Sequence, residues 1–261
     1  MSSKIVTRIA PTPSGWLHFG NIANFLLIEK IIKNNHGELF LRIDDCDNTR
    51  TRKEFVEHIF LVLKYLGIDY HYGPKNILDF EENFSQTTRA SYYFDKLQDI
   101  GHRIFACECS RKEIGNRIYP GTCREKKIRF IPGEHSLRLR TDSEKFGDVI
   151  VWRKDNGPAY HWVSVIDDLE HQVNLIVRGE DLKESTELQM IMARILTEDG
   201  FSKVRFFHHP LLHDPHGEKL SKTNKSASIL DLMNKNISAD QIRADLAKIV
   251  DPWYETFIKS F

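Results

Sequence analysis

Residues 8–21 have the sequence RIAPTPSGWLHFGN, which holds two prolines, two glycines and one histidine. The stretch follows a short apolar run and precedes a helical pattern that begins at Asn21. Glycine permits close approach of the backbone and proline stiffens it, so an ordinary connector needs few of either. We therefore expect a rigid loop that joins a strand to a helix and holds a ligand.

The segments around this loop predict an α/β fold with a parallel sheet. KIVTRIA at 4–10 is typical of a short buried strand, and a well-buried helix is expected at 21–34. Gly37 then breaks the helix, and ELFLRI at 38–43 is a second strand. A strand, a helix and a strand in this order favour parallel pairing. The helix would start beside the loop, where its unpaired N–H groups and positive dipole end suit phosphate.

Further helices and strands are expected along the rest of the chain. Periodicity and breakers predict helices at 53–66, 86–100 and 185–198, and strands at 103–109, 136–140, 174–179 and 204–212. The stretch 148–166 predicts two strands around an Asp-Asn-Gly turn. The last 35 residues are expected to be helical, with Ser238 as the N-cap and Pro252 as a stop.

Composition and charge restrict the class of protein. The 261 residues carry 37 basic and 37 acidic side chains, which argues against a broad, non-specific nucleic-acid binder. No apolar stretch approaches the roughly 18 residues that a membrane-spanning helix needs. The first residues, MSSKIVTRIA, lack the apolar core of a signal peptide. We therefore expect a cytoplasmic protein without a membrane partner.

Three of the four cysteines lie close together in the sequence. Cys107, Cys109 and Cys123 fall within 17 residues, whereas Cys46 stands apart. In a chain without an export signal, such a cluster favours a metal site over disulfides.

A second motif follows the opening loop by about 200 residues. KLSKT at 219–223 places two lysines around a serine, where they can neutralise a charged transition state. The order Pro-x-Pro-Ser-Gly-x-x-His-x-Gly, then Lys-Leu-Ser-Lys, resembles the two signature motifs of class I aminoacyl-tRNA synthetases. LRIDDCD at 41–47, AYHWVSVIDD at 159–168 and IVRGEDL at 176–182 make the chain similar to the glutamyl branch of that class.

The resemblance covers residues 5 to about 225 and implies a Rossmann-like, parallel-sheet catalytic domain. The implied parts are a first catalytic half at 1–101, an inserted β-rich, zinc-binding acceptor module at 102–170, a second half with the KLSK loop at 171–225, and a short helical region at 226–261. A full glutamyl-tRNA synthetase continues into an anticodon-binding domain, for which we expect no room here. The shortened relatives are the glutamyl-queuosine tRNA(Asp) synthetases. That family activates glutamate with ATP and transfers it to the queuosine base of tRNA(Asp).

Many members of that family have a zinc site of the form Cys-x-Cys, a spacer, then Tyr-x-x-x-Cys. This sequence has CEC at 107–109 and YPGTC at 119–123, with a spacer of nine residues that is slightly shorter than usual for the family. The ligands that the resemblance implies are Cys107, Cys109, Tyr119 and Cys123. Three thiolates and one phenol oxygen would make a closed site, typical of structural Zn²⁺.

The resemblance also implies which residues act on ATP and its Mg²⁺. The implied ATP-binding residues are His18, Gly20, Asn21, Glu180 and Lys222. His18 and Asn21 would contact phosphates, with Asn21 in the place of the motif's usual second histidine. Lys222, supported by Lys219, would stabilise the leaving phosphates. His18, Asn21, Lys219 and Lys222 are therefore the expected catalytic residues.

For glutamate, the implied residues are Arg8, Ala10, Thr12, Asp44, Tyr160 and Arg178. Arg8 and Arg178 would bind the side-chain carboxylate, which a planar guanidinium can hold through two hydrogen bonds. Asp44 would accept the α-ammonium. It stands where the family has Glu in its RIED motif, and Thr12 stands where Ser is common, so the pocket differs at two positions.

On the acceptor side, CREKKIRF at 123–130 with Arg138 and Arg140 forms a basic zone that could meet RNA phosphates. We expect tRNA(Asp) carrying queuosine as the partner of a monomer. Two alternatives stay open: an enzyme that passes the acyl group to a carrier protein or small amine, and a non-catalytic paralogue that binds ATP or RNA. The presence of His18 and Lys222 makes the paralogue the weakest of the three.

Overall fold

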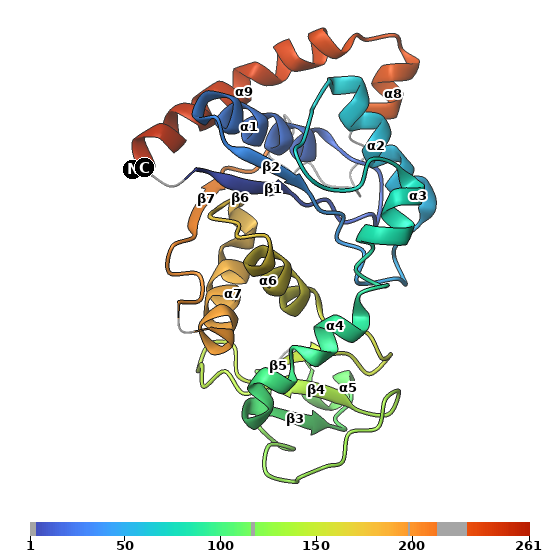
Figure 1. The fold of residues 1–261 in the computed structure, drawn as a ribbon, viewed down its shortest axis with the longest axis vertical. Helices are drawn as coiled ribbons and strands as arrows, with labels where there is room; N and C mark the ends of the chain where they lie inside the picture. Colours follow the sequence, from blue (N-terminus) through green and yellow to red (C-terminus); the bar gives the residue numbers. More distant parts are fainter. Residues whose placement is uncertain (1–3, 116–117, 198, 213–228) are drawn as a thin grey trace. The chain divides into compact units, whose positions relative to one another are not determined.

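The computed structural model describes residues 4–115, 118–197, 199–212 and 229–261 (Figure 1). The chain forms two compact units. The first unit contains Met1–Ser85, Gln172–Lys183 and Val204–Phe261, and the second contains Gln86–His171 and Glu184–Lys203. Each unit thus combines segments that are far apart in the sequence. The domain boundaries that the family resemblance implies stay predictions.

The first unit contains the predicted strand–helix–strand arrangement. Strands β1 (Val6–Ile9) and β2 (Glu38–Leu41) pair in parallel, and helix α1 (Phe19–Asn35) connects them. A second parallel pair consists of β6 (Leu175–Gly179) and β7 (Arg205–His209). Asn174 joins the pairs, because its backbone N–H donates to the Val6 carbonyl at 3.0 Å while its side-chain oxygen accepts from the Val6 N–H at 2.9 Å.

Helix α1 ends in a turn where the chain passes very close to itself. His36 adopts a left-handed conformation with φ of 50°, so the reversal begins one residue before the expected breaker. A Cβ atom on Gly37 would lie 2.8 Å from the Ile5 carbonyl oxygen and 2.6 Å from Cδ1 of Ile32. Glycine is therefore required at position 37 because of close packing, and not because of a positive φ.

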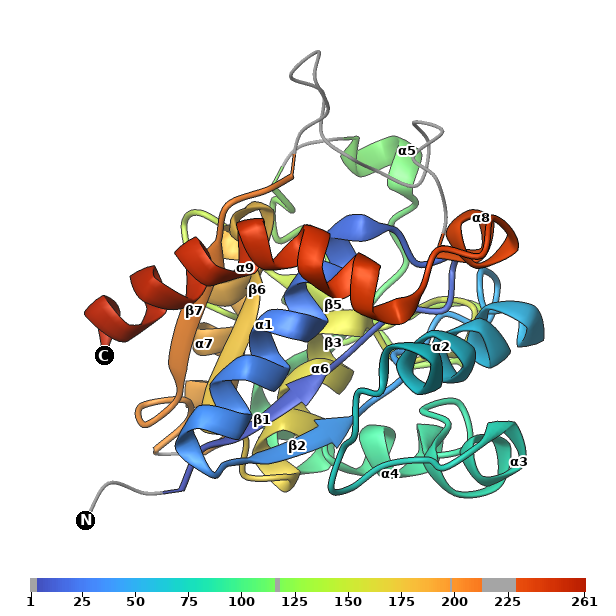
Figure 2. The same cartoon turned by 90° about the horizontal axis from the view of Figure 1, so that it is seen from above.

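The remaining helical segments of the first unit are α2 (Lys53–Leu66), α3 (Ile77–Asp79), η1 (Phe80–Phe84), η3 (Glu180–Leu182), α8 (Ile229–Asn234) and α9 (Ala239–Ser260). Helix α2 ends at Gly67 in the left-handed conformation, as predicted. Helix α9 lies along α1 (Figure 2), and its Ser238 cap is confirmed, since the hydroxyl accepts from the Gln241 N–H at 3.2 Å.

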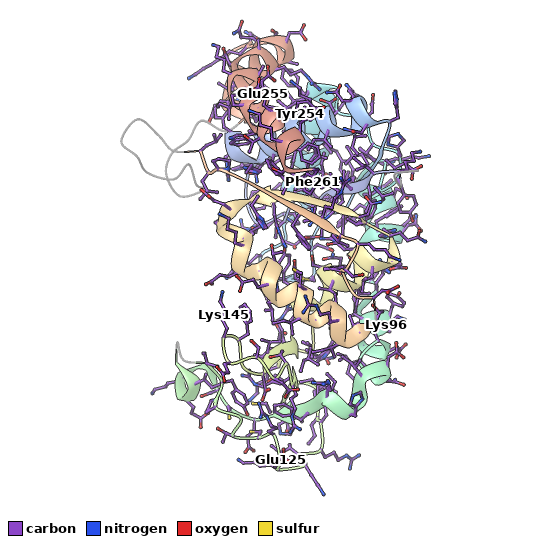
Figure 3. The ribbon with its side chains drawn as sticks, turned by 90° about the vertical axis from the view of Figure 1, so that its left-hand side faces the viewer. Lys96, Glu125, Lys145, Tyr254, Glu255 and Phe261 are labelled. Atoms are coloured by element: carbon purple, nitrogen blue, oxygen red, sulfur yellow. The ribbon has the colours of Figure 1, made fainter. Side chains whose placement is uncertain are left out.

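Pro252 does not stop the last helix, so that prediction is wrong. Helix α9 continues through Pro252 to Ser260. Proline removes one backbone donor from a helix, but Trp253 and Phe257 are buried in the core on either side of the next turn. Tyr254 and Phe261 flank Phe257, with ring centroids 6.2 and 5.0 Å away (Figure 3). Burial of Trp253 and Phe257 offsets the lost hydrogen bond.

The second unit is built on a three-stranded antiparallel sheet with β4 in the middle. Its strands are β3 (Ile104–Cys107), β4 (Ser136–Leu139) and β5 (Val149–Trp152). Its helical segments are α4 (Ala90–Asp95), η2 (Gln98–Arg103), α5 (Arg111–Ile114), α6 (Tyr160–Glu170) and α7 (Lys183–Leu196, from Glu184 onward). The Lys145 ammonium joins the loop before β5 to α7 through Glu187 at 2.6 Å (Figure 3).

In this unit, one predicted strand is wrong and one predicted helix is shorter than expected. The Asp-Asn-Gly turn exists, with Asn156 at φ of 64°, but residues 160–170 after it form α6 and not a second strand. Residues 162–168 are all buried, polar ones included, so the sequence offers no apolar–polar alternation that could distinguish a strand from an enclosed helix. The helix expected at 86–100 is confirmed only in part: the range contains the short α4 and the start of the 3-10 helix η2, and the backbone leaves helical geometry at Ile100.

Among the described residues, no helix is both long and apolar enough to cross a bilayer.

Candidate functional site

The loop between β1 and α1 ends in a side-chain cap on α1. The Nδ1 atom of His18 accepts a hydrogen bond from the Gly20 N–H at 3.1 Å, and Oδ1 of Asn21 accepts from the His18 N–H at 3.1 Å. This is a capping box with His and Asn in the two capping positions. Because Nδ1 accepts, the neutral imidazole of His18 carries its proton on Nε2.

Glycine at position 20 makes room for that imidazole. A Cβ atom there would lie 3.0 Å from Cε1 and 3.1 Å from Nδ1 of His18. The first turn of α1 contains no acidic residue. The structure therefore brings His18, Gly20 and Asn21 together at a helix N-terminus whose field favours an anion.

A cluster of aromatic rings supports the loop, and the sequence reasoning missed it. The Trp16 ring packs edge-on against Phe55 and His58 of α2, with centroids 5.0 and 5.1 Å away. Among the described residues, neither ring nitrogen of His58 has a hydrogen-bond partner. Burial lowers the pKa of His58 to about 4, so the ring is neutral near pH 7. Only the spacing of three between Phe55 and His58 could have indicated their shared helix face.

Asp44 lies directly beside the same loop. Its backbone N–H donates to the Pro11 carbonyl at 2.9 Å, which places it next to the segment that contains Ala10 and Thr12. Its carboxylate is 2% exposed and accepts two hydrogen bonds from Arg42, from Nε at 2.6 Å and from a terminal nitrogen at 3.3 Å. The sequence reasoning missed Arg42, which holds the carboxylate expected to meet the α-ammonium.

Arg8 and Arg178 are buried on two strands of the first unit. Arg8 lies on β1 and Arg178 on β6, where its guanidinium is 5.4 Å from the centre of the Phe206 ring. His208 is the register partner of Arg178 on β7. Burial, with Arg178 as the next contributor, lowers the pKa of His208 to about 4. Both arginines thus lie in the unit that contains the opening loop.

The other predicted site residues are Tyr160, Glu180 and the two lysines of the KLSK motif. Tyr160 begins α6 in the second unit and is partly exposed. Glu180 follows β6 and pairs with Lys183 at 3.3 Å. Lys219 and Lys222 lie outside the described residues.

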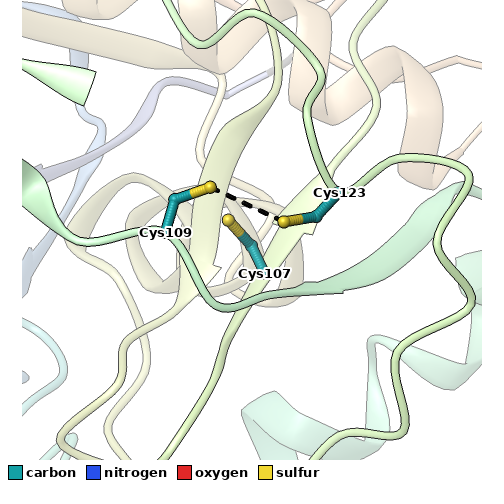
Figure 4. A group of neighbouring side chains, drawn as sticks. All are labelled: Cys107, Cys109 and Cys123. Carbon is teal, nitrogen blue, oxygen red and sulfur yellow. Dashed lines mark hydrogen bonds between the residues drawn. The ribbon is translucent and has the colours of Figure 1, made fainter. Parts of the chain in front are cut away.

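The predicted metal ligands come together in the second unit. The sulfur atoms of Cys107, Cys109 and Cys123 all lie within 4.8 Å of one another (Figure 4). Cys109 Sγ is 3.6 Å from Cys123 Sγ, and Cys107 Sγ is 3.4 Å from the Tyr119 hydroxyl. Tetrahedral zinc, with Zn–S of about 2.3 Å and Zn–O of about 2.0 Å, spaces its ligands about 3.5–3.8 Å apart. The four residues therefore fit Zn²⁺.

The thiol environment also changes the protonation of the cluster. Burial, with the neighbouring Cys123 and Cys107 thiols, raises the pKa of Cys109 to about 11. Burial alone would raise the pKa of Cys107, but hydrogen bonds from Tyr119 and Arg138 outweigh it and the pKa lies below the usual value. Metal binding to such a set releases protons, because thiolates are the ligands.

The basic zone expected to face RNA is largely paired within the protein. Arg124 makes two hydrogen bonds to Asp148 at 2.9 and 2.8 Å. Two further ion pairs join Lys126 to Glu108 at 2.7 Å and Arg140 to Glu125 at 2.5 Å. Arg138 is buried, so the expectation that it faces RNA phosphates is wrong.

Comparison with known proteins defines the family. Residues 4–114 and 134–243 match the family model described as tRNA synthetases class I (E and Q), catalytic domain. The glutamyl-Q tRNA(Asp) synthetase of Synechococcus sp. (strain CC9605) is 35% identical over 92% of this chain and 81% of its own length. The chain belongs to the glutamyl-Q tRNA(Asp) synthetase family. A second member, from Parasynechococcus marenigrum (strain WH8102), is 36% identical over the same shares.

The solved structures agree on the fold. A glutamate-tRNA synthetase from Elizabethkingia anophelis matches with a TM-score of 0.70 at 22% identity, over 84% of this chain and 53% of that chain. The chain thus spans about half the length of that synthetase. The class I catalytic fold expected from the motifs, with parallel strands and helices, is confirmed.

Family membership makes the chain an enzyme, an ATP-dependent ligase of the class I glutamyl-Q synthetases. Class I synthetases use ATP and Mg²⁺. The roles of individual residues, the inserted module and the missing anticodon-binding domain stay predictions.

Proposed function

We propose that this protein activates glutamate with ATP and transfers the glutamyl group to the queuosine base of tRNA(Asp). The observation that carries the proposal is the capped N-terminus of α1, formed by His18, Gly20 and Asn21 directly after the loop that Asp44 contacts. The names of the relatives that match most of the chain support the choice of acceptor.

In the activation step, a carboxylate oxygen of glutamate attacks the α-phosphorus of ATP, and pyrophosphate leaves. The protein supplies positioning and charge stabilisation for this step. The Nε2–H of His18 donates to a phosphate oxygen, and the positive end of the α1 dipole favours the phosphate charge. Lys219 and Lys222 are proposed to stabilise the leaving phosphates, with Glu180 on the nucleotide side. Mg²⁺, when bound with ATP, neutralises phosphate charge.

The amino acid is proposed to lie across the first unit. Arg8 and Arg178 hold its side-chain carboxylate, and Asp44 accepts its ammonium, with Ala10 and Thr12 as further contacts. The contact that the family resemblance implies for Tyr160 stays a prediction. Arg42 already donates twice to Asp44, so it fixes the carboxylate and shares its negative charge. Since Asp is one methylene shorter than Glu, we propose that the ammonium lies deeper or is bridged by water.

The cysteine cluster is proposed to be structural. Cys107, Cys109, Tyr119 and Cys123 would hold Zn²⁺, which tethers the loop after β3 to the sheet. A closed four-ligand site leaves no open coordination position, so zinc would take no part in acyl transfer. We also propose that the enzyme works as a cytoplasmic monomer.

A non-tRNA acceptor is the second candidate. It is favoured by the internal ion pairs of Arg124, Lys126 and Arg140, which leave these side chains less available to RNA phosphates.

The test is ATP–pyrophosphate exchange with zinc-loaded protein and each amino acid in turn, without tRNA. We expect exchange with glutamate. Labelled glutamate is then offered to tRNA(Asp) with and without queuosine, and we expect label only on the modified tRNA. Absence of exchange with every amino acid would contradict the enzyme. Exchange without transfer to either tRNA would point to the second candidate.

A further inference from the structure

Arg138 on β4 is a buried cation beside the cysteine cluster. Its side chain is 6% exposed, and its guanidinium carbon lies 3.8 Å from the centre of the Tyr119 ring. One terminal nitrogen donates to the Asp148 carbonyl at 2.8 Å, and the positive charge of the guanidinium helps to lower the pKa of the Cys107 thiol. Among the described residues, its Nε has no hydrogen-bond partner.

The sheet fixes this arrangement. Arg138 is the register partner of Phe105 on β3, and the Phe105 ring stacks near Tyr119 with centroids 6.2 Å apart. Arg138 and Phe105 therefore position the same phenol ring, whose hydroxyl contacts Cys107 Sγ. Burial of the Arg138 guanidinium costs free energy of folding unless a negatively charged group lies close to it.

Zinc with three thiolates has a net charge of −1, and a bound phenolate makes it −2. Such a charge in a largely buried site needs a nearby cation. Lys126 also lies near the cluster, but it is exposed and paired with Glu108 at 2.7 Å. Arg138 is a buried cation that lies over the Tyr119 ring, whose hydroxyl contacts the Cys107 thiol.

We propose that Arg138 is a charge-compensating and positioning residue of the metal site, and that its positive charge sets the affinity of the protein for zinc. It acts through Tyr119 and Cys107 and does not bind the metal itself. This inference rests on the zinc site of the proposed function and is independent of glutamate activation and tRNA.

The test is the zinc dissociation constant of the full-length protein, measured by competition with a fluorescent chelator. Partner groups around metal ligands typically change affinity about 10- to 100-fold. Arg138→Gln keeps a donor for the Asp148 carbonyl but removes the charge, so we expect its dissociation constant to rise by about that factor. Arg138→Lys keeps the charge and should restore most of the affinity. The control Lys126→Gln removes an exposed, paired charge and should change it by about twofold or less.

Two further measurements keep the result interpretable. Arg138→Met fills similar space without charge or donor and stands in if Arg138→Gln does not fold; it should weaken zinc binding as strongly. The Co²⁺ absorption spectrum of each variant should retain tetrahedral sulfur coordination, since Arg138 is not a ligand.

The inference would be overturned if zinc bound equally tightly to the unmodified protein, Arg138→Gln and Arg138→Met. It would also be overturned if Arg138→Lys bound zinc as weakly as the two uncharged variants. An unmodified protein that binds no zinc would overturn the metal site itself. Neither result bears on pyrophosphate exchange, which tests the proposed activity separately.

Discussion

At the N-cap of α1, one imidazole has two separable tasks. Nδ1 of His18 caps the helix through the Gly20 N–H, whereas Nε2 carries the proton proposed to meet phosphate. Asparagine is among the preferred N-cap residues, so it can replace the first task but not the second.

We therefore expect His18→Asn to keep its free energy of unfolding within about 1 kcal/mol while pyrophosphate exchange falls by about 10²- to 10³-fold. Urea unfolding and the exchange assay check the two halves. The matched control is His36→Asn at the exposed, left-handed end of α1, where asparagine is tolerated and exchange should not change. Similar exchange in both variants would show that His18 is only a cap.

The sequence could predict the residues of this loop because its motif is local. It could not predict that Arg42 pairs with Asp44, or that Trp16 packs against His58. Those contacts depend on how side chains from a loop, a strand end and a helix meet after folding. Lys219 and Lys222 remain a prediction from the motif alone.

Among the described helices, Arg243 links three by hydrogen bonds. It extends from α9 to Glu29 of α1 at 2.8 and 3.1 Å and to the Leu66 carbonyl at the end of α2 at 2.7 Å. Burial raises the pKa of Glu29, but the hydrogen bonds from Arg243 and Lys33 outweigh it, so the pKa is lowered.

Arg243→Met should destabilise the protein by about 2–3 kcal/mol, because it leaves the Glu29 carboxylate buried with one fewer cation. We expect Lys30→Met, which removes the more exposed Lys30–Asp251 pair between the same two helices, to cost less than about 1 kcal/mol. Urea unfolding measures both. In the double variant Glu29→Gln with Arg243→Met, the cost should be smaller than the sum of the single costs; additive costs would mean that the pair is not coupled.

Helices and strands could be predicted where the local pattern of apolar residues determined them. They could not be predicted where residues are buried by contacts with elements distant in the sequence. The short apolar runs of β1 and β2, with a helix between them, sufficed to predict a parallel pair. In α6 and around Pro252, the packing of apolar residues against neighbouring elements determines the helical conformation. Local residue propensity does not predict that conformation.

The stability of the whole molecule should depend on pH through His58. In the unfolded chain histidine has a pKa of about 6.5, whereas burial lowers the pKa of His58 to about 4. Between these values the unfolded chain binds more protons than the folded one, so the free energy of unfolding falls as the pH falls from 6.5 towards 4. The loss should reach up to about 3 kcal/mol.

His58→Leu removes the titrating group. Between pH 6.5 and pH 4, the free energy of unfolding of this variant should fall by up to about 3 kcal/mol less than that of the unmodified protein. Urea unfolding at intervals from pH 7 to pH 4.5, at constant ionic strength, measures the difference. An unchanged m-value shows that the variant exposes the same surface on unfolding. Parallel curves for the two proteins would show that His58 is not responsible.

The inclusion of Glu184–Lys203 in the second unit could not be predicted from the sequence. The second unit combines Gln86–His171 with Glu184–Lys203, and the first combines three separate stretches. Such groupings depend on contacts between residues distant in the sequence, about which local periodicity carries no information. The cysteine spacing did predict a cluster, because a short spacer brings its ligands together whatever surrounds them.

The cysteine cluster has a consequence for handling the protein in air. Three thiols within 4.8 Å of one another are suited to zinc, and without metal they are equally placed for oxidation. One oxidising event joins two of the sulfurs in a disulfide, and the third is then the only thiolate left for a metal ion. Zinc and reductant therefore protect the same atoms, and metal lost during purification is replaced only while the thiols stay reduced.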